Sequence, residues 1–240
     1  MSAIATIHDR PVSATDVVRL QFANPNRTLA VPLYILGGVV LLTVAISIAI
    51  LRAGGTLDGA DFNASVLWSV VGYTVAVGVQ NVSASFPFAL ALGSTRRAFV
   101  LGNLASAFAQ AAVVAVVAVL LLGLEHLTGG WFIGARALGT ELLGDGNPAV
   151  LGGLMLLTVL AALSVGGVFA AAWVRFGARG PLVLTLAVAA LAVLALLLLL
   201  PQLTTFFAGF EPWWLAVGGA ALIGLSLVGQ YLFLRRASIR

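Results

Sequence analysis

The sequence predicts an all-α integral membrane protein with six transmembrane helices, and three observations support this fold class. Hydrophobic residues make up 61% of the 240 residues, whereas charged residues make up only 8%, against about 25% in a soluble domain. The mean hydropathy is +1.13. Six apolar runs each have about the 20 residues that a helix needs to cross a bilayer. So little polar surface excludes a soluble enzyme and a disordered chain.

The N-terminal segment 1–28 is polar and contains no apolar stretch of the kind found in a cleavable signal peptide, so none is expected. Within it, Ala14–Ala23 is predicted to form a short amphipathic helix, capped by Ser13 or Thr15 and with Asp16 in its first turn. Such a helix lies in the membrane interface; a frayed cytoplasmic tail is the alternative.

The remaining residues, 29–240, are predicted to form the six-helix transmembrane domain. No span has an acidic or basic residue in its middle. The expected spans cover residues 31–51, 66–92, 99–124, 149–174, 182–200 and 213–234. The longest outer loop, 125–148, contains a GDGNP turn, and the loop before the last span, 201–212, is expected to be short.

The charges predict how the chain lies across the membrane. If the N-terminus is cytoplasmic, ten arginines fall on the inner side and only Arg52 and Arg136 on the outer side. Cytoplasmic loops of membrane proteins carry such an excess of basic residues. Both termini are therefore expected in the cytoplasm. The ten inner arginines are Arg10, Arg19, Arg27, Arg96, Arg97, Arg175, Arg179, Arg235, Arg236 and Arg240.

Missing residue types narrow the chemistry. The chain has no cysteine, no lysine and two histidines, so we expect no metal site and no P-loop, whose lysine contacts the phosphates. No convergent catalytic set is visible, and an enzyme is not expected. Glu125 and His126, the neighbouring acid and imidazole at the outer end of the third span, are predicted to lie at a solvated helix end. The basic pI, about 10.7, reflects membrane orientation rather than nucleic-acid binding.

Amides and hydroxyls are the polar groups inside the spans. Gln80, Asn81, Ser85 and Gln110 are the candidates for a translocation path. The same side chains would serve equally as hydrogen-bonding partners between helices, because an unpaired amide in hydrocarbon is costly. Pro87 is expected to bend its helix.

A short turn joins the second and third spans, and its residues have two interpretations. Gly93 is expected to end one helix, Ser94 or Thr95 to cap the next, and Arg96 and Arg97 to face the cytoplasm. The turn is either an ordinary tight connection with positive-inside charges, or a rigid knuckle that docks on a cytoplasmic partner.

This turn, with the sequence ALGSTRRAFVLG, resembles the turn between helices two and three in permeases of type-2 ABC exporters, especially small permeases common in actinobacteria. The segment DVVRLQFANPNRT before the first span, the six-helix count and the Arg235-Arg236 end are also similar. In larger members of that family the outer re-entrant segment lies between helices five and six, whereas here the longest outer loop lies between helices three and four.

The resemblance implies a fold and a set of partners. Such permeases work in pairs with two copies of a separate ATPase subunit, which binds ATP and Mg²⁺. The pre-membrane helix would be the elbow on the inner leaflet. Gly93, Ser94, Thr95, Arg96 and Arg97 would contact the ATPase as the coupling helix.

From these observations we expect the permease subunit of an ATP-driven exporter in a bacterial plasma membrane, with no ATPase site of its own. Its second permease would be identical or related, and its cargo an amphiphile such as a lipid, a drug or a peptide. The alternative is a non-transporting membrane anchor or sensor subunit for a cytoplasmic partner.

Overall fold

The computed structural model describes residues 12–57, 64–208, 213–235 and 237, and these residues form helices and turns without a strand. Six helices are long and apolar enough to cross a membrane, which confirms the predicted all-α class and the count of six. These helices are α2 (Val31–Arg52), α3 (Ala64–Ser83, continued by the short α4, Ser85–Ala91), α5 (Arg96–Leu127), α6 (Pro148–Phe176), α7 (Arg179–Ala208) and α8 (Trp213–Arg235).

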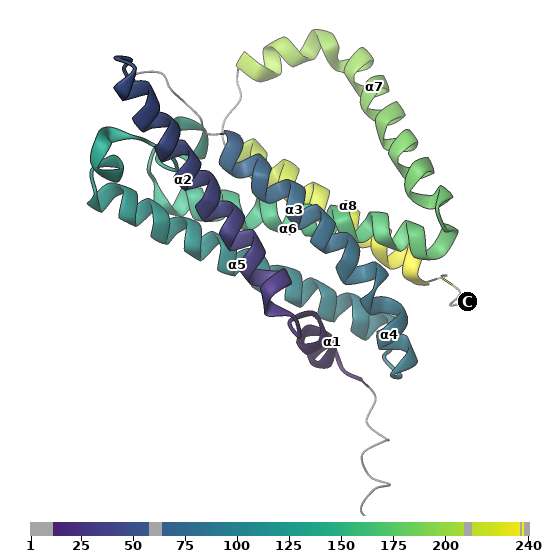
Figure 1. Ribbon diagram of the computed structural model, residues 1–240. Helices are drawn as coiled ribbons and strands as arrows, with labels where there is room; N and C mark the ends of the chain where they lie inside the picture. The colour runs from purple at the N-terminus through teal and green to yellow at the C-terminus, as the bar shows by residue number, and fades with distance from the viewer. Residues whose placement is uncertain (1–11, 58–63, 209–212, 236, 238–240) are drawn as a thin grey trace, which may run out of the picture.

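Helix α6 is the centre of the bundle. It packs against α3, α5 and α8, while α2 lies along α3 (Figure 1). The short helix α1 (Ala14–Gln21) lies against α5 at one end of the bundle. Helix α7 starts beside α6 and then arcs outward, and none of its most apolar stretch is buried. Five spans therefore form the packed body, and the remaining one, α7, stands apart from it.

Glycines bring the backbones of α3 and α6 into direct contact. A Cβ atom added to Gly166 would lie 2.2 Å from the carbonyl oxygen of Val75, and one added to Gly78 would lie 2.4 Å from that of Leu163. Neither position has room for a side chain. Small residues permit this close approach. The resulting van der Waals packing stabilises the helix pair, because helices in lipid have no hydrophobic driving force to associate.

The second predicted span is two helices rather than one. The α-helix is interrupted at Ala84, between α3 and α4, three residues before Pro87. Proline has no backbone N–H, so it cannot donate to the carbonyl of Ser83. The helix is therefore interrupted at Ala84, within one turn of the proline at which the sequence predicts a bend.

Most helices extend beyond the predicted apolar runs, and polar side chains cap the first turns of α5 and α6. The Thr95 hydroxyl accepts from the Ala98 N–H at 3.1 Å, and Asn147 Oδ1 accepts from the Ala149 N–H at 2.9 Å. The predicted loop over 201–212 is wrong in its first part, since α7 continues to Ala208. Pro201 removes only one hydrogen bond from this helix, and its leucine-rich N-terminal flank favours helix.

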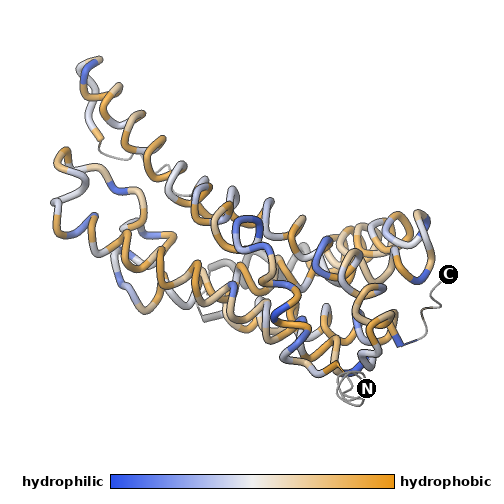
Figure 2. Tube along the Cα trace, turned by 60° about the horizontal axis from the view of Figure 1, so that its bottom comes forward, coloured by the Kyte–Doolittle hydropathy of each residue, from blue (hydrophilic) through white to orange (hydrophobic). Residues whose placement is uncertain are grey.

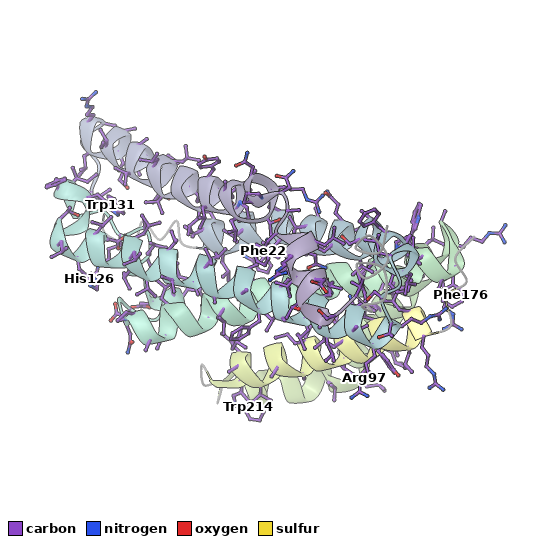
Figure 3. The ribbon with its side chains drawn as sticks, turned by 90° about the horizontal axis from the view of Figure 1, so that it is seen from below. Phe22, Arg97, His126, Trp131, Phe176 and Trp214 are labelled. Atoms are coloured by element: carbon purple, nitrogen blue, oxygen red, sulfur yellow. The ribbon has the colours of Figure 1, made fainter. Side chains whose placement is uncertain are left out.

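Hydrophobic residues predominate along the bundle, and hydrophilic stretches occur at its ends and in places along its length (Figure 2). Arg97 and Phe176 lie at one end, and His126 and Trp131 lie at the other (Figure 3). We call the end with Arg97 and Phe176 the basic end, and the end with His126 and Trp131 the acidic end. Seven of the nine arginines in the described residues belong to the basic end: Arg19, Arg27, Arg96, Arg97, Arg175, Arg179 and Arg235.

Substitution of Gly166 by alanine tests the α3–α6 contact. The added methyl group meets the backbone of α3, so we expect Gly166→Ala to cost about 1–3 kcal/mol and to lower the melting temperature in detergent. Gly153→Ala on the same helix is the control, because nothing lies within 4 Å of its added Cβ. Equal melting temperatures for the two variants would contradict the close crossing.

Candidate functional site

Helix α1 is fixed to α5 by an apolar contact. It begins after Ser13, whose backbone N–H donates to Asp16 Oδ2 at 3.0 Å, so Ser13 rather than Thr15 precedes the first turn. Val17 is fully buried, and a Cβ added to Gly102 of α5 would lie 2.6 Å from Val17 Cβ. The helix thus lies directly on a glycine of α5.

The side chain of Gln21 extends this contact into a hydrogen-bonded cluster. Its Nε2 donates to Asn103 Oδ1 at 2.7 Å, and its Oε1 accepts from the hydroxyl of Ser106. Asn103 Nδ2 in turn donates to Gln230 Oε1 of α8 at 3.4 Å. The Gln21 amide therefore connects α1 to α5, and the Asn103 amide connects α5 to α8.

The segment between α1 and α2 joins the same cluster. Arg27 Nη2 donates to Asn81 Oδ1 of α3 at 3.3 Å, and the Tyr73 hydroxyl donates to the carbonyl of Arg27 at 3.0 Å. Gln110 Nε2 donates to the carbonyl of Thr28. We define the buried amide cluster as these bonded side chains, which extend from the basic end to the middle of α5: Gln21, Asn81, Asn103, Ser106, Gln110 and Gln230.

The four candidate path residues separate in the structure. Asn81 and Gln110 belong to the buried amide cluster, whereas Gln80 is exposed and Ser85 is half-buried at the start of α4. The side chains of Asn81 and Gln110 form hydrogen bonds to the segment between α1 and α2. Gln110 Oε1 and Gln230 Nε2 are buried and lack a hydrogen-bond partner among the described residues, so the cluster still has polar atoms to satisfy.

The turn between α4 and α5 is closed by hydrogen bonds at both helix ends. The N–H of Ser94 donates to the carbonyl of Ala89 at 2.9 Å, and that of Gly93 to Leu90 at 3.0 Å. Gly93 has a φ of +87°, which an L side chain rarely adopts. The predicted helix end at Gly93 and the cap at Thr95 are both found. The turn is therefore a defined structure and not a loose loop.

The two arginines of this turn differ in their surroundings. Arg96 binds the C-terminal end of α8, where it donates to the carbonyls of Leu234 at 2.9 Å, of Arg235, and of Ala237 at 2.8 Å. The carbonyls of Leu234 and Arg235 belong to the last turn of α8, where the helix supplies no N–H donor, and the Leu234 carbonyl also accepts from the Ala237 N–H at 3.3 Å. Arg97 is exposed, as are Gly93 and Thr95, whereas Ser94 is buried. The guanidinium group of Arg97 is therefore the exposed one, whereas that of Arg96 is bound to the end of α8.

At the acidic end, Glu125 is only 2% exposed, so the predicted solvated helix end is wrong for this residue. Its Oε2 accepts from the Trp131 indole N–H at 3.0 Å and from the backbone N–H groups of Ala137 and Leu138 at 3.0 and 2.9 Å. Its Oε1 accepts from the Gly139 N–H at 2.9 Å. These four N–H donors satisfy the carboxylate and offset the cost of burying it. His126 is exposed, as predicted.

A pocket of about 490 Å³ lies beside this carboxylate. Its wall includes His126, Arg136 and Asp145, and the last two lie 3.7 Å apart as an exposed ion pair. Trp131 and Phe132 of the adjoining turn have positive φ angles of 57° and 65°, a conformation that non-glycine residues adopt only when the surroundings impose it. Among the described residues no group of three or more His, Asp or Glu side chains is placed to hold a metal ion.

Sequence reasoning missed two buried polar residues, although a signal existed for one of them. Gln21 lies four residues after Val17, so the two share a helix face, and both are buried. Glu125 offered no such signal, because its donors are backbone groups that the loop fold brings together.

Comparison with known proteins identifies no relative: no family model, curated protein or solved structure matches the chain.

Replacement of Glu125 by glutamine tests the carboxylate as the organiser of the loop between α5 and α6. The amide keeps the shape but turns donors toward N–H groups, so we expect a loss on the order of 2–3 kcal/mol. Hydrogen exchange of the amides at 137–139 would rise. Glu141→Gln is the control, because Glu141 is an exposed acid of the same loop. Unchanged exchange at 137–139 in Glu125→Gln would contradict this role.

Proposed function

We propose that this chain is the membrane-spanning permease subunit of an ATP-driven exporter of the type-2 ABC class. The observation that carries the proposal is the turn from Gly93 to Arg97. It is closed at both helix ends, it presents the exposed Arg97, and Arg96 binds it to the end of α8. A short rigid turn between two spans transmits a push from a cytoplasmic partner better than a flexible loop.

Charge and resemblance support the orientation that this function requires. The basic end has seven of the nine described arginines, and an excess of arginine is typical of the cytoplasmic side. The turn also has the sequence that resembles the coupling helix of these permeases. We therefore place the basic end, with both termini, in the cytoplasm and the protein in a bacterial plasma membrane. In this orientation α1 is the elbow helix at the inner leaflet.

The partners follow from what the chain lacks. It has no lysine, so the P-loop that binds ATP and Mg²⁺ belongs to a separate ATPase subunit, present in two copies. A second permease, identical or related, completes the membrane part. The cargo is an amphiphile, in keeping with the apolar faces of the spans.

The buried amide cluster gives a physical route from the turn to the spans. The turn begins α5, and Asn103 lies two helical turns further along the same helix. Asn103 is bonded to α1 through Gln21 and to α8 through Gln230. When the ATPase subunits close on ATP, a displacement of the turn moves α1, α5 and α8 together.

Co-purification from the native host tests the proposal. We expect the tagged chain, extracted in mild detergent, to bring down a stoichiometric protein with a P-loop. Arg97→Glu should remove that partner by charge reversal at the exposed position, with little change in melting temperature. Arg52→Glu at the other end is the control for a charge change alone, and it should retain the partner.

Arg96→Glu separates stability from docking. It removes the Arg96 guanidinium from three carbonyls at the end of α8, so we expect a lower melting temperature as well as weaker docking. The exporter proposal fails if no ATPase co-purifies under conditions that preserve other complexes. It also fails if Arg97→Glu retains the partner in full.

A further inference from the structure

The pocket at the acidic end has charges of both signs in its wall. It has a volume of about 490 Å³ and lies between the end of α5 and the loop that follows this helix. Its titratable lining residues are Glu125, His126, Arg136 and Asp145, and the other five lining residues are glycines. A groove of about 450 Å³ between α6 and α8 contains Glu141 as its single charged residue, and grooves of about 580 and 380 Å³ contain none. The exporter function proposed above uses none of the residues of this wall.

The backbone around this pocket is strained. Trp131, Phe132 and Asp145 are the three non-glycine residues with a positive φ among the residues that the structure describes. Asp145 belongs to the wall, and the other two lie between two of its glycines. Strain of this kind persists only where the surroundings impose it, and it clusters at ligand-binding sites. The four N–H groups that donate to Glu125 hold this loop, so the wall has its shape before a ligand binds.

The charges of the wall match a ligand that has both an ammonium group and an oxyanion. Arg136 and Asp145 lie 3.7 Å apart, and their side chains are 69% and 73% exposed. An exposed ion pair contributes little to stability, so a ligand with two charges can separate the pair and bind both partners. The buried carboxylate of Glu125 adds a second negative charge, which favours a cation beside Asp145. A plain anion would meet two carboxylates, and a plain cation would leave Arg136 without its partner.

We infer that this pocket binds a small zwitterion that has a primary ammonium group and an oxyanion. The ammonium group donates to the carboxylate of Asp145, and the oxyanion accepts from the guanidinium of Arg136. The five glycines leave the space for the ligand, because they place no side chain in the pocket. The site does not depend on the ATPase partnership proposed above.

Two sources supply this chemistry. The pocket lies where α5 ends at Leu127 and before α6 begins at Pro148, so in a bilayer it is at the depth of the lipid headgroups. The headgroup of phosphatidylethanolamine has a primary ammonium group and a phosphate. The soluble compound glycerophosphoethanolamine has the same two groups without the acyl chains, and it reaches the pocket from water.

Titration of the full chain in nanodiscs of phosphatidylglycerol alone tests this site. Glycerophosphoethanolamine is compared with glycerophosphocholine, whose quaternary ammonium group has the same charge but no N–H to donate. A charge-assisted hydrogen bond is lost in the second compound, so we expect its dissociation constant to be about ten-fold higher or more. Nanodiscs that contain phosphatidylethanolamine distinguish the two sources. Glycerophosphoethanolamine binds more weakly there if the lipid headgroup fills the pocket, and equally well if the ligand comes from water.

Two variants test the two charges separately. Asp145→Asn should remove the preference for glycerophosphoethanolamine and leave the fold intact, because asparagine tolerates the φ of +48° at this position. Arg136→Gln should weaken both compounds about ten-fold or more. The controls are Glu141→Gln, an exposed acid of the same loop, and Arg52→Gln, an exposed arginine at the end of α2, and both should leave the two dissociation constants unchanged. The inference is overturned if neither compound binds, if both bind equally, or if the preference survives Asp145→Asn.

Discussion

The amide of Gln21 is bonded on both of its polar atoms to α5, and the rest of the basic end depends on that attachment. Helices in a bilayer gain nothing from hydrophobic burial against one another, so directional bonds and close packing determine how they associate. Here the bonds come from amides and a hydroxyl, and the close packing comes from glycines such as Gly102 beneath α1. Together they hold α1 against the bundle in a defined orientation, which an apolar surface alone would not impose.

The two ends of the bundle are organised by different chemistry. At the basic end, guanidinium groups bind carbonyls at helix ends, as Arg96 does for α8 and Arg175 does for Leu232. At the acidic end, one carboxylate accepts from four N–H groups and holds the loop between α5 and α6 against α5. In both cases a charged side chain satisfies backbone groups that regular helix cannot. The consequence is a bundle with fixed ends, in which α7 alone is loosely attached along its length.

The sequence predicted what depends on local pattern. Hydropathy and length were sufficient for the six spans, the Gly93 end and the Thr95 cap follow from local backbone chemistry, and Pro87 marked the break before α4. The sequence did not predict contacts between distant segments. The burial of Glu125, and the attachment of Arg96 to α8, arise only when loops and helix ends meet in space. Pro201 misled the prediction of the last loop because a proline interrupts one hydrogen bond without ending a helix in apolar surroundings.

A double-mutant cycle between Gln21 and Asn103 measures most directly whether the buried amide cluster holds the basic end as one body. Gln21→Leu, Asn103→Leu and the double variant would be compared by their free energies of unfolding in mixed micelles. Bonds between membrane helices average about 0.6 kcal/mol and reach about 1.7 kcal/mol, and the 2.7 Å contact between these amides predicts a coupling of about 1 kcal/mol or more. Effects that add to within about 0.3 kcal/mol would show that α1 is held by apolar packing alone and would contradict the account.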